Sequence, residues 1–165
     1  MVRTQNKNPI YALSSFDVST SNEKSYLAIK DCLKELCVHN PLFLFGESGC
    51  GKTYLIRAFT NEIIKQGKKA LYITENEVTD DMVQLLLENK KDQLKKLYNE
   101  YDVLVIDDLF SINWMTDTQK AFTELIDEFY SENKQVILVS TRSLDDFPVI
   151  SEYIKSLKTN LIINI

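Results

Sequence analysis

The sequence predicts an α/β fold in which helices cover both faces of a five-stranded parallel sheet. Five short runs are rich in β-branched and aromatic residues, as in strands that are buried on both faces. Segments with the 3.6-residue period of an amphipathic helix separate these runs. This alternation builds βαβ units with right-handed crossovers, so we expect three layers with the sheet in the middle.

The elements can be assigned in order along the chain. An amphipathic helix over 26–37 comes first. The five strands are expected at 42–46, 69–73, 102–107, 135–140 and 161–165. The helices between them are expected at 53–65, 80–98 and 118–133, the second being either two short helices or one helix broken near Asn89. Each helix has an apolar face. In the helix at 53–65 this face is formed by Leu55, Ile56, Phe59 and Ile63.

Length and composition indicate one ordinary globular domain. The 165 residues contain 44% hydrophobic and 26% charged residues, and no apolar run is long enough to span a membrane. The N-terminus has no signal-peptide core, and Cys32, Cys37 and Cys50 are too scattered for a disulfide framework. We therefore expect a single domain over 1–165 in the reducing cytoplasm. The net charge of −5 gives no basic footprint for duplex DNA.

The stretch GESGCGKT matches the phosphate-loop pattern G-x-x-x-x-G-K-[ST] and lies between a predicted strand and a predicted helix. Its backbone amides and the positive end of the following helix suit a phosphate group. Lys52 would contact the outer phosphates, and the Thr53 hydroxyl suits Mg²⁺. The expected nucleotide-binding residues here are Gly46, Glu47, Ser48, Gly49, Cys50, Gly51, Lys52 and Thr53.

Two carboxylates follow the third predicted strand in the stretch VLVIDD. Four apolar residues followed by two acids form a Walker B pattern, in which Asp107 would face Mg²⁺ and Asp108 would polarise an attacking water. The alternative is that the two acids cap the next helix. The nearby phosphate loop favours metal binding.

The order of several motifs resembles the AAA+ large subdomain of the DnaA family of bacterial replication initiators. These motifs are NPIYALSSFDVSTSN, NPLFLFGESGCGKTYLIRA, LYITENEVTDDMVQLLLENK, LYNEYDVLVIDDL, TQKAF and KQVILVSTR. Hda-type proteins and helicase loaders are similar more loosely. The resemblance runs from about Asn8 to Ile165 and implies a P-loop NTPase fold, ATP as the nucleotide, and ATP-dependent assembly in DNA replication.

The resemblance also implies roles for residues outside the phosphate loop. It implies that the N-terminal segment 1–24 contributes to an adenine pocket through Tyr11, Phe16, Val18 and Asn22. The alternative for these four residues is packing in the core. Thr141 follows the fourth strand, where AAA+ enzymes have a polar residue that senses the γ-phosphate and helps to orient water. The alternative for Thr141 is a turn residue at a strand end.

The chain also departs from the family pattern. Two arginines of the family, one of them an arginine finger, are replaced here by Tyr153 and Leu157. The nearby Lys155 or Lys158 could substitute, but lysine matches the spread charge of a phosphate less well than arginine does. The loop FSINWMTDTQ lacks the basic residues that help the family bind single-stranded DNA, and Asp117 stands where a cation would be expected. Trp114 in this loop either stacks on a base or packs on the protein as an anchor. The family's helical lid and helix-turn-helix domain have no counterpart in these residues, so we expect no sequence-specific duplex binding.

These observations favour a nucleotide switch in replication initiation or its regulation, which binds ATP and ADP with Mg²⁺ and is at best a weak ATPase. Expected catalytic residues are Lys52, Asp108 and Thr141, and expected metal ligands are Thr53 and Asp107. Expected partners are like AAA+ subunits, a DnaA-type initiator or a replicative helicase, with only weak single-stranded DNA contact. The alternatives are a protein-binding module that has lost catalysis and an ATPase of the helicase-loader or transposition type. A small-molecule kinase ranks last.

Overall fold

The computed structural model describes residues 10–88, 96–109 and 116–165. Their helices and strands are α1 (Glu23–Lys34), β1 (Leu42–Phe45), α2 (Lys52–Lys65), β2 (Ala70–Thr74), α3 (Glu75–Leu87), β3 (Val103–Leu109), α5 (Thr116–Ser131), β4 (Gln135–Ser140), α6 (Pro148–Ser156) and β5 (Leu161–Asn164). Two short 3-10 turns lie at Leu13–Ser15 and Leu144–Asp146.

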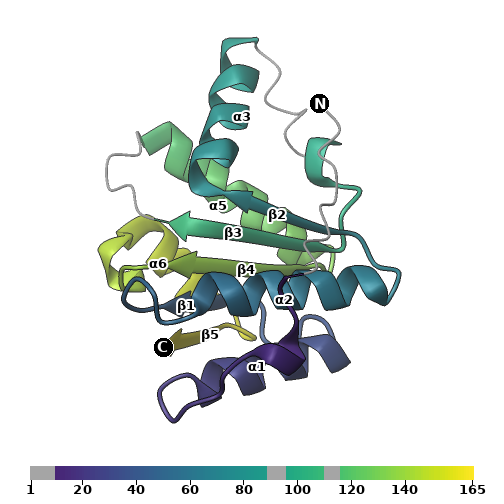
Figure 1. Ribbon diagram of the computed structural model, residues 1–165. Helices are drawn as coiled ribbons and strands as arrows, with labels where there is room; N and C mark the ends of the chain where they lie inside the picture. Colours follow the sequence, from purple (N-terminus) through teal and green to yellow (C-terminus); the bar gives the residue numbers. More distant parts are fainter. Residues whose placement is uncertain (1–9, 89–95, 110–115) are drawn as a thin grey trace.

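The described strands form a parallel sheet in the order β2-β3-β4-β1-β5, which confirms the five-stranded α/β prediction. The arrowheads of β3, β4 and β5 point to the left in Figure 1, and the loop between β1 and α2 lies at that edge. β4 lies between β1 and β3, so the phosphate loop and the Walker B acids are separated by one strand. The carboxyl ends of all three strands meet at the edge where α/β sheets bind ligands.

The sheet is covered on both faces, because alternate strand residues point to opposite sides. On one face, Leu42, Leu44 and other strand residues pack with α1 and α2. On the other, Phe43 and its neighbours pack with α3, α5 and α6. Figure 1 shows α2 in front of the sheet and α5 and α6 behind it. The three-layer arrangement expected from the sequence is therefore present.

Several element boundaries differ from the sequence prediction. The first helix ends at Lys34 rather than at residue 37, where Cys37 has a left-handed φ of 67°. α3 begins at Glu75, five residues early, because the Glu77 carboxylate accepts hydrogen bonds from the Thr74 N–H and hydroxyl and so caps the helix. The expected break near Asn89 falls outside the described residues. α6 was not predicted.

The described part of the chain contains no helix that is both long and apolar enough to cross a membrane.

Candidate functional site

The phosphate loop joins β1 to α2 and makes a sharp turn that excludes side chains at two points. Gly46 has a φ of 155°, and a Cβ atom there would lie 2.4 Å from the Ile165 carbonyl oxygen. Gly51 has a φ of 97°, and a Cβ atom there would lie 3.3 Å from the Phe16 ring. Glycine is required at both positions because side chains rarely tolerate such angles and Gly46 leaves no room for one.

Lys52 is the first residue of α2, and its side chain folds back over the loop. The residue is only 7% exposed. Its ammonium group donates hydrogen bonds of 2.7 Å to the carbonyl oxygens of Gly46 and Glu47, and it lies 3.3 Å from the Cys50 sulfur. The loop therefore holds a positive charge beside its own backbone, as a phosphate cradle requires.

Asp107 lies near the end of β3 and is the most buried acid of the site, at 1% exposure. Its Oδ2 accepts hydrogen bonds from the Thr53 hydroxyl, at 3.0 Å, and from the Tyr72 hydroxyl. Its Oδ1 accepts one from the Asp108 backbone N–H, at 2.8 Å. The structure thus brings the two expected metal ligands, Thr53 and Asp107, into direct contact.

Asp108 occupies a different environment one residue later. Its backbone is left-handed, with a φ of 58°, and the residue is exposed. Partial burial of the carboxyl group, together with the negative charge of Asp107, raises the pKa of Asp108 above its ordinary value. A carboxylate with a raised pKa at the mouth of a cleft is suited to accept a proton.

A cavity of about 280 Å³ lies between these groups. It is lined by Ser48, Gly49, Gly51, Lys52, Thr53, Tyr54, Asp107, Asp108, Ser140 and Thr141. The ends of β1, β3 and β4 therefore contribute to one cleft, and all three expected catalytic residues, Lys52, Asp108 and Thr141, line it.

Ser140 fixes the end of β4 beside Thr141. Its hydroxyl donates a 2.6 Å hydrogen bond to the Leu109 carbonyl and accepts one from the Arg142 N–H at 2.9 Å. Ser140 is buried, whereas Thr141 is exposed and lines the cavity. Ser140 thus links the ends of β3 and β4.

The comparisons with known proteins agree with this geometry. The family model of the bacterial DnaA ATPase domain matches residues 7–164. The chain belongs to this family. The chromosomal replication initiator protein DnaA of Aquifex aeolicus (strain VF5) is 32% identical over 136 residues, which cover 82% of this chain and 34% of that protein. The chain therefore spans about a third of the length of the curated DnaA relatives that it matches.

Solved structures show the same similarity. A replication initiator DnaA bound to AMPPCP and single-stranded DNA has a TM-score of 0.83 and 28% identity, covering 96% of this chain and 50% of that chain. The DnaC helicase loader has a TM-score of 0.76 and 19% identity, covering 94% of this chain and 97% of that chain. The likeness to the loader is one of fold alone.

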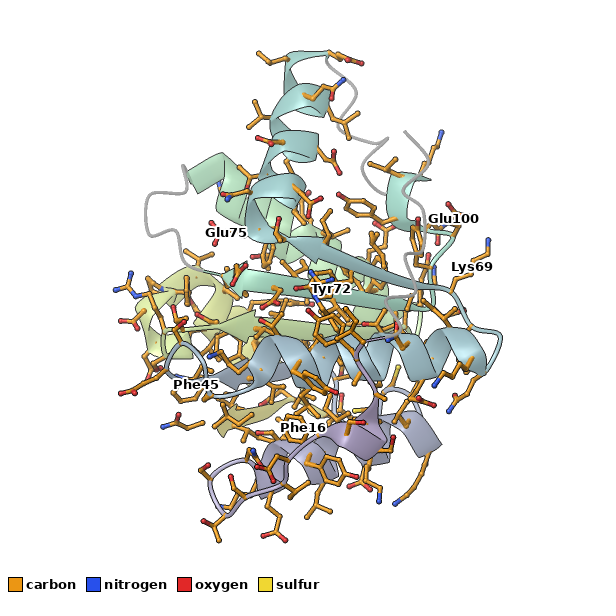
Figure 2. The ribbon with its side chains drawn as sticks, viewed as in Figure 1. Phe16, Phe45, Lys69, Tyr72, Glu75 and Glu100 are labelled. Atoms are coloured by element: carbon orange, nitrogen blue, oxygen red, sulfur yellow. The ribbon has the colours of Figure 1, made fainter. Side chains whose placement is uncertain are left out.

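The N-terminal segment of this DnaA-type domain packs against the phosphate loop through Phe16. The Phe16 ring stacks on Tyr26 of α1 and lies 5.9 Å from the Tyr54 ring of α2, between the two helices in Figure 2. The Tyr11 ring meets Tyr54 edge-on at 5.2 Å. Phe16 thus joins the segment to the loop.

None of the four residues assigned to the adenine pocket lines the cavity. Val18 is 43% exposed. Asn22 is buried and holds the turn before α1, because its side chain accepts from the Ser19 N–H and donates to the Asp17 carbonyl. The role of all four residues toward adenine stays a prediction.

The two positions at which the resemblance implies family arginines lie on and just after α6. The Tyr153 hydroxyl donates a 2.8 Å hydrogen bond to Asp127 of α5, and Leu157 follows the last turn of α6. Lys155 pairs with Asp145, and Lys158 is exposed. Trp114 lies outside the described residues, and Asp117 falls in the first turn of α5.

Sequence reasoning missed three residues of the site: Tyr54, Tyr72 and Ser140. Tyr72 lies in β2, which β3 and β4 separate from β1, and it was assigned to the buried strand alone. The signal in the sequence was its hydroxyl, because Tyr72 places a polar group between the apolar residues Leu71 and Ile73. Tyr72 is half-buried, and a phenol in such a place usually finds a hydrogen-bond partner, which here is Asp107.

Proposed function

We propose that this chain binds ATP and ADP with Mg²⁺ at the phosphate loop and acts as a nucleotide switch in the initiation of DNA replication or in its regulation. The observation that carries the proposal is the convergence of Lys52, Thr53 and Asp107 on one cavity. A cation, a hydroxyl and a buried carboxylate at the carboxyl edge of a parallel sheet are the groups that a magnesium–nucleotide complex needs.

The residues present fit such a ligand. Gly46 and Gly51 keep the loop free of side chains where the backbone turns. Lys52 is directed at the loop, and Thr53 and Asp107 offer the oxygen ligands that Mg²⁺ prefers. Bound Mg²⁺ would supply positive charge to the phosphate groups.

Hydrolysis by this chain is expected to be slow. Asp108 and Thr141 both line the cavity. In this proposal Asp108 takes a proton from the attacking water and Thr141 helps to orient that water. Neither Tyr153 nor Leu157 can supply the cationic charge of an arginine finger, whose loss in related NTPases lowers the rate by about 10³–10⁵-fold. The chain is therefore proposed to respond to its nucleotide more than to consume it.

The proposed partners follow from the family. A similar replication initiator DnaA was solved bound to AMPPCP and single-stranded DNA. We extend nucleotide binding to this chain, and propose like AAA+ subunits, a DnaA-type initiator or a replicative helicase as protein partners. Contact with single-stranded DNA is proposed to be weak, and the cytoplasm stays the predicted location.

One observation favours a second function, that of a docking module without catalysis. The partly buried Tyr153 side chain packs against the core under α5 and α6, and its hydroxyl donates to the exposed Asp127 carboxylate. At this position the side chain therefore makes contacts within the domain and carries no cationic group. Rapid ATP turnover by the chain would rule this second function out.

Equilibrium binding of ATP and ADP in the presence of Mg²⁺ tests the proposal. We expect Lys52→Ala to weaken binding by about 10- to 100-fold, because a buried cation that faces the phosphates is lost. The matched control is Lys65→Ala, since Lys65 lies on the same helix but is exposed and paired with Glu62. Equal affinity of wild type and Lys52→Ala would contradict the proposal.

A further inference from the structure

Three residues on one stripe of α2 contact three different parts of the molecule. Thr53, Arg57 and Asn61 are spaced four residues apart and so lie along one side of the helix. The Thr53 hydroxyl donates to Asp107, as described above. The Asn61 side chain donates a 2.7 Å hydrogen bond to the Tyr11 carbonyl. Arg57, between them, lies over an aromatic ring.

Arg57 is held by stacking. Its guanidinium carbon lies 4.1 Å from the centroid of the Tyr72 ring and 5.5 Å from that of Tyr11. Its Nε atom is buried and has no hydrogen-bond partner among the described residues. The flat guanidinium group therefore meets the face of Tyr72, an attraction between a cation and an aromatic ring that a lysine matches less well.

Tyr72 in turn is held between Arg57 and Asp107. Figure 2 shows the Tyr72 side chain between β2 and α2. Its hydroxyl donates to the same Asp107 oxygen that accepts from Thr53.

We propose that Tyr72 is a positioning residue for Asp107, and that Arg57 acts through Tyr72 by fixing its ring. This inference rests on the proposed function, because it assigns to Tyr72 the orientation of the carboxylate that would face Mg²⁺. Donors on both Asp107 oxygens hold the carboxylate against rotation: Thr53 and Tyr72 on one, and the Asp108 N–H on the other. Partners that orient a metal ligand commonly change metal affinity by about 10- to 100-fold when they are lost.

The first test removes only the Tyr72 hydroxyl. Tyr72→Phe keeps the ring under Arg57, so the fold and the nucleotide affinity in EDTA should stay within about twofold of wild type. The Mg²⁺ concentration that half-saturates the gain in ATP affinity should rise about tenfold. Tyr98→Phe is the matched control, because its hydroxyl also donates to a carboxylate, that of Asp81, away from the cavity.

The second test examines Arg57 in a double-mutant cycle. Arg57→Met should raise the half-saturating Mg²⁺ concentration in the same direction as Tyr72→Phe. In the double variant the two effects should not add, because both act through the same hydroxyl. Arg57→Lys should recover part of the loss.

The outcomes separate this inference from the proposed function. An unchanged Mg²⁺ requirement in Tyr72→Phe, with normal nucleotide binding, overturns the positioning role and leaves the proposed function intact. Fully additive effects overturn the link through Arg57. Absence of nucleotide binding by the wild type, with or without Mg²⁺, overturns both the proposed function and the positioning role. Thermal unfolding of each variant guards against a loss caused by misfolding.

Discussion

Two neighbouring acids at the end of β3 have opposite environments. Asp107 is buried and receives hydrogen bonds on both oxygens, whereas Asp108 is exposed at the mouth of the cavity in a left-handed conformation. Side chains alternate along a strand, and the pairing of β3 with β4 is irregular between Ile106 and Leu109, where Asp108 has its left-handed backbone. These two features separate the two carboxylates. One acid is therefore suited to hold a ligand in place and the other to exchange a proton.

The raised pKa of Asp108 predicts a stability cost. The folded chain binds a proton at Asp108 more readily than the unfolded chain does. The ionised carboxylate therefore lowers the free energy of unfolding at any pH above the pKa of Asp108 in the folded chain. This loss of stability disappears as the pH falls below the pKa of Asp108 in the unfolded chain. Asp108→Asn should stabilise the chain at pH 7 by less than about 1 kcal/mol, since the group is largely exposed and screened.

Urea unfolding of wild type and Asp108→Asn at pH 7 and near pH 4 measures this effect. The advantage of the variant should shrink at the lower pH, and its ATP hydrolysis should fall below that of wild type. An advantage that grows as the pH falls would contradict the assigned sign.

The motif residues could be predicted from the sequence, because a phosphate loop and a Walker B strand each fit within a few consecutive residues. Tyr72 could not be predicted in this way. Its partner Asp107 is 35 positions away and in another strand, so the contact exists only once β2 and β3 are paired in register. Chemistry that depends on pairing between strands leaves little local signal.

At the scale of elements, a buried amide network ties the amino end of β4 to the segment before β1. The Gln135 side chain donates to the His39 carbonyl at 2.8 Å and accepts from the Cys37 N–H at 2.8 Å. The Asn40 side chain donates to the Lys134 carbonyl and accepts from the Val136 N–H. These bonds satisfy backbone groups that the sheet leaves unpaired where its central strands begin.

Truncation of this network should destabilise the fold without touching the nucleotide site. Gln135→Ala leaves the Cys37 N–H and the His39 carbonyl without their partner, and we expect the free energy of unfolding to fall by about 2–4 kcal/mol. Gln84→Ala, on the exposed side of α3, should change it by less than about 0.5 kcal/mol. Urea unfolding measures both, and equal effects of the two variants would count against the network.

Sequence periodicity placed α2 and α5 closely, placed α1 and α3 less accurately, and missed the short α6. α2 and α5 have several turns of apolar spacing, so they were placed within two residues at each end. α6 has nine residues, too few for the pattern to stand out, although Pro148 at its first position and the buried Ile150 and Ile154 are consistent with a helix. Its role in the fold became clear only from its packing with α5.

At the scale of the whole molecule, the strand order joins the parts of the site. The sequence predicts which segments are strands, but not that β4 inserts between β1 and β3. That insertion brings Thr141 between the phosphate loop and the Walker B acids. The order arises from the packing of helices on both faces, which depends on many residues far apart in the chain.

The residues proposed to contact the nucleotide lie at the ends of three strands and on one helix, so binding should stabilise the entire domain. At about 100 times the dissociation constant, a ligand specific for the folded state adds about 2.7 kcal/mol. For a chain of this size, that corresponds to a rise in Tm of roughly 5–10 °C. Thermal unfolding with and without ATP and Mg²⁺ measures the shift, which Lys52→Ala should largely abolish.

The stripe on α2 also constrains how this chain can change over evolution. Thr53, Arg57 and Asn61 reach Asp107, Tyr72 and Tyr11 only because they follow one another at helical intervals. A single inserted or deleted residue between 53 and 61 would turn the later positions by about 100° and break the contacts beyond it. Substitutions in this stretch can arise one at a time, whereas changes in length must be compensated at once.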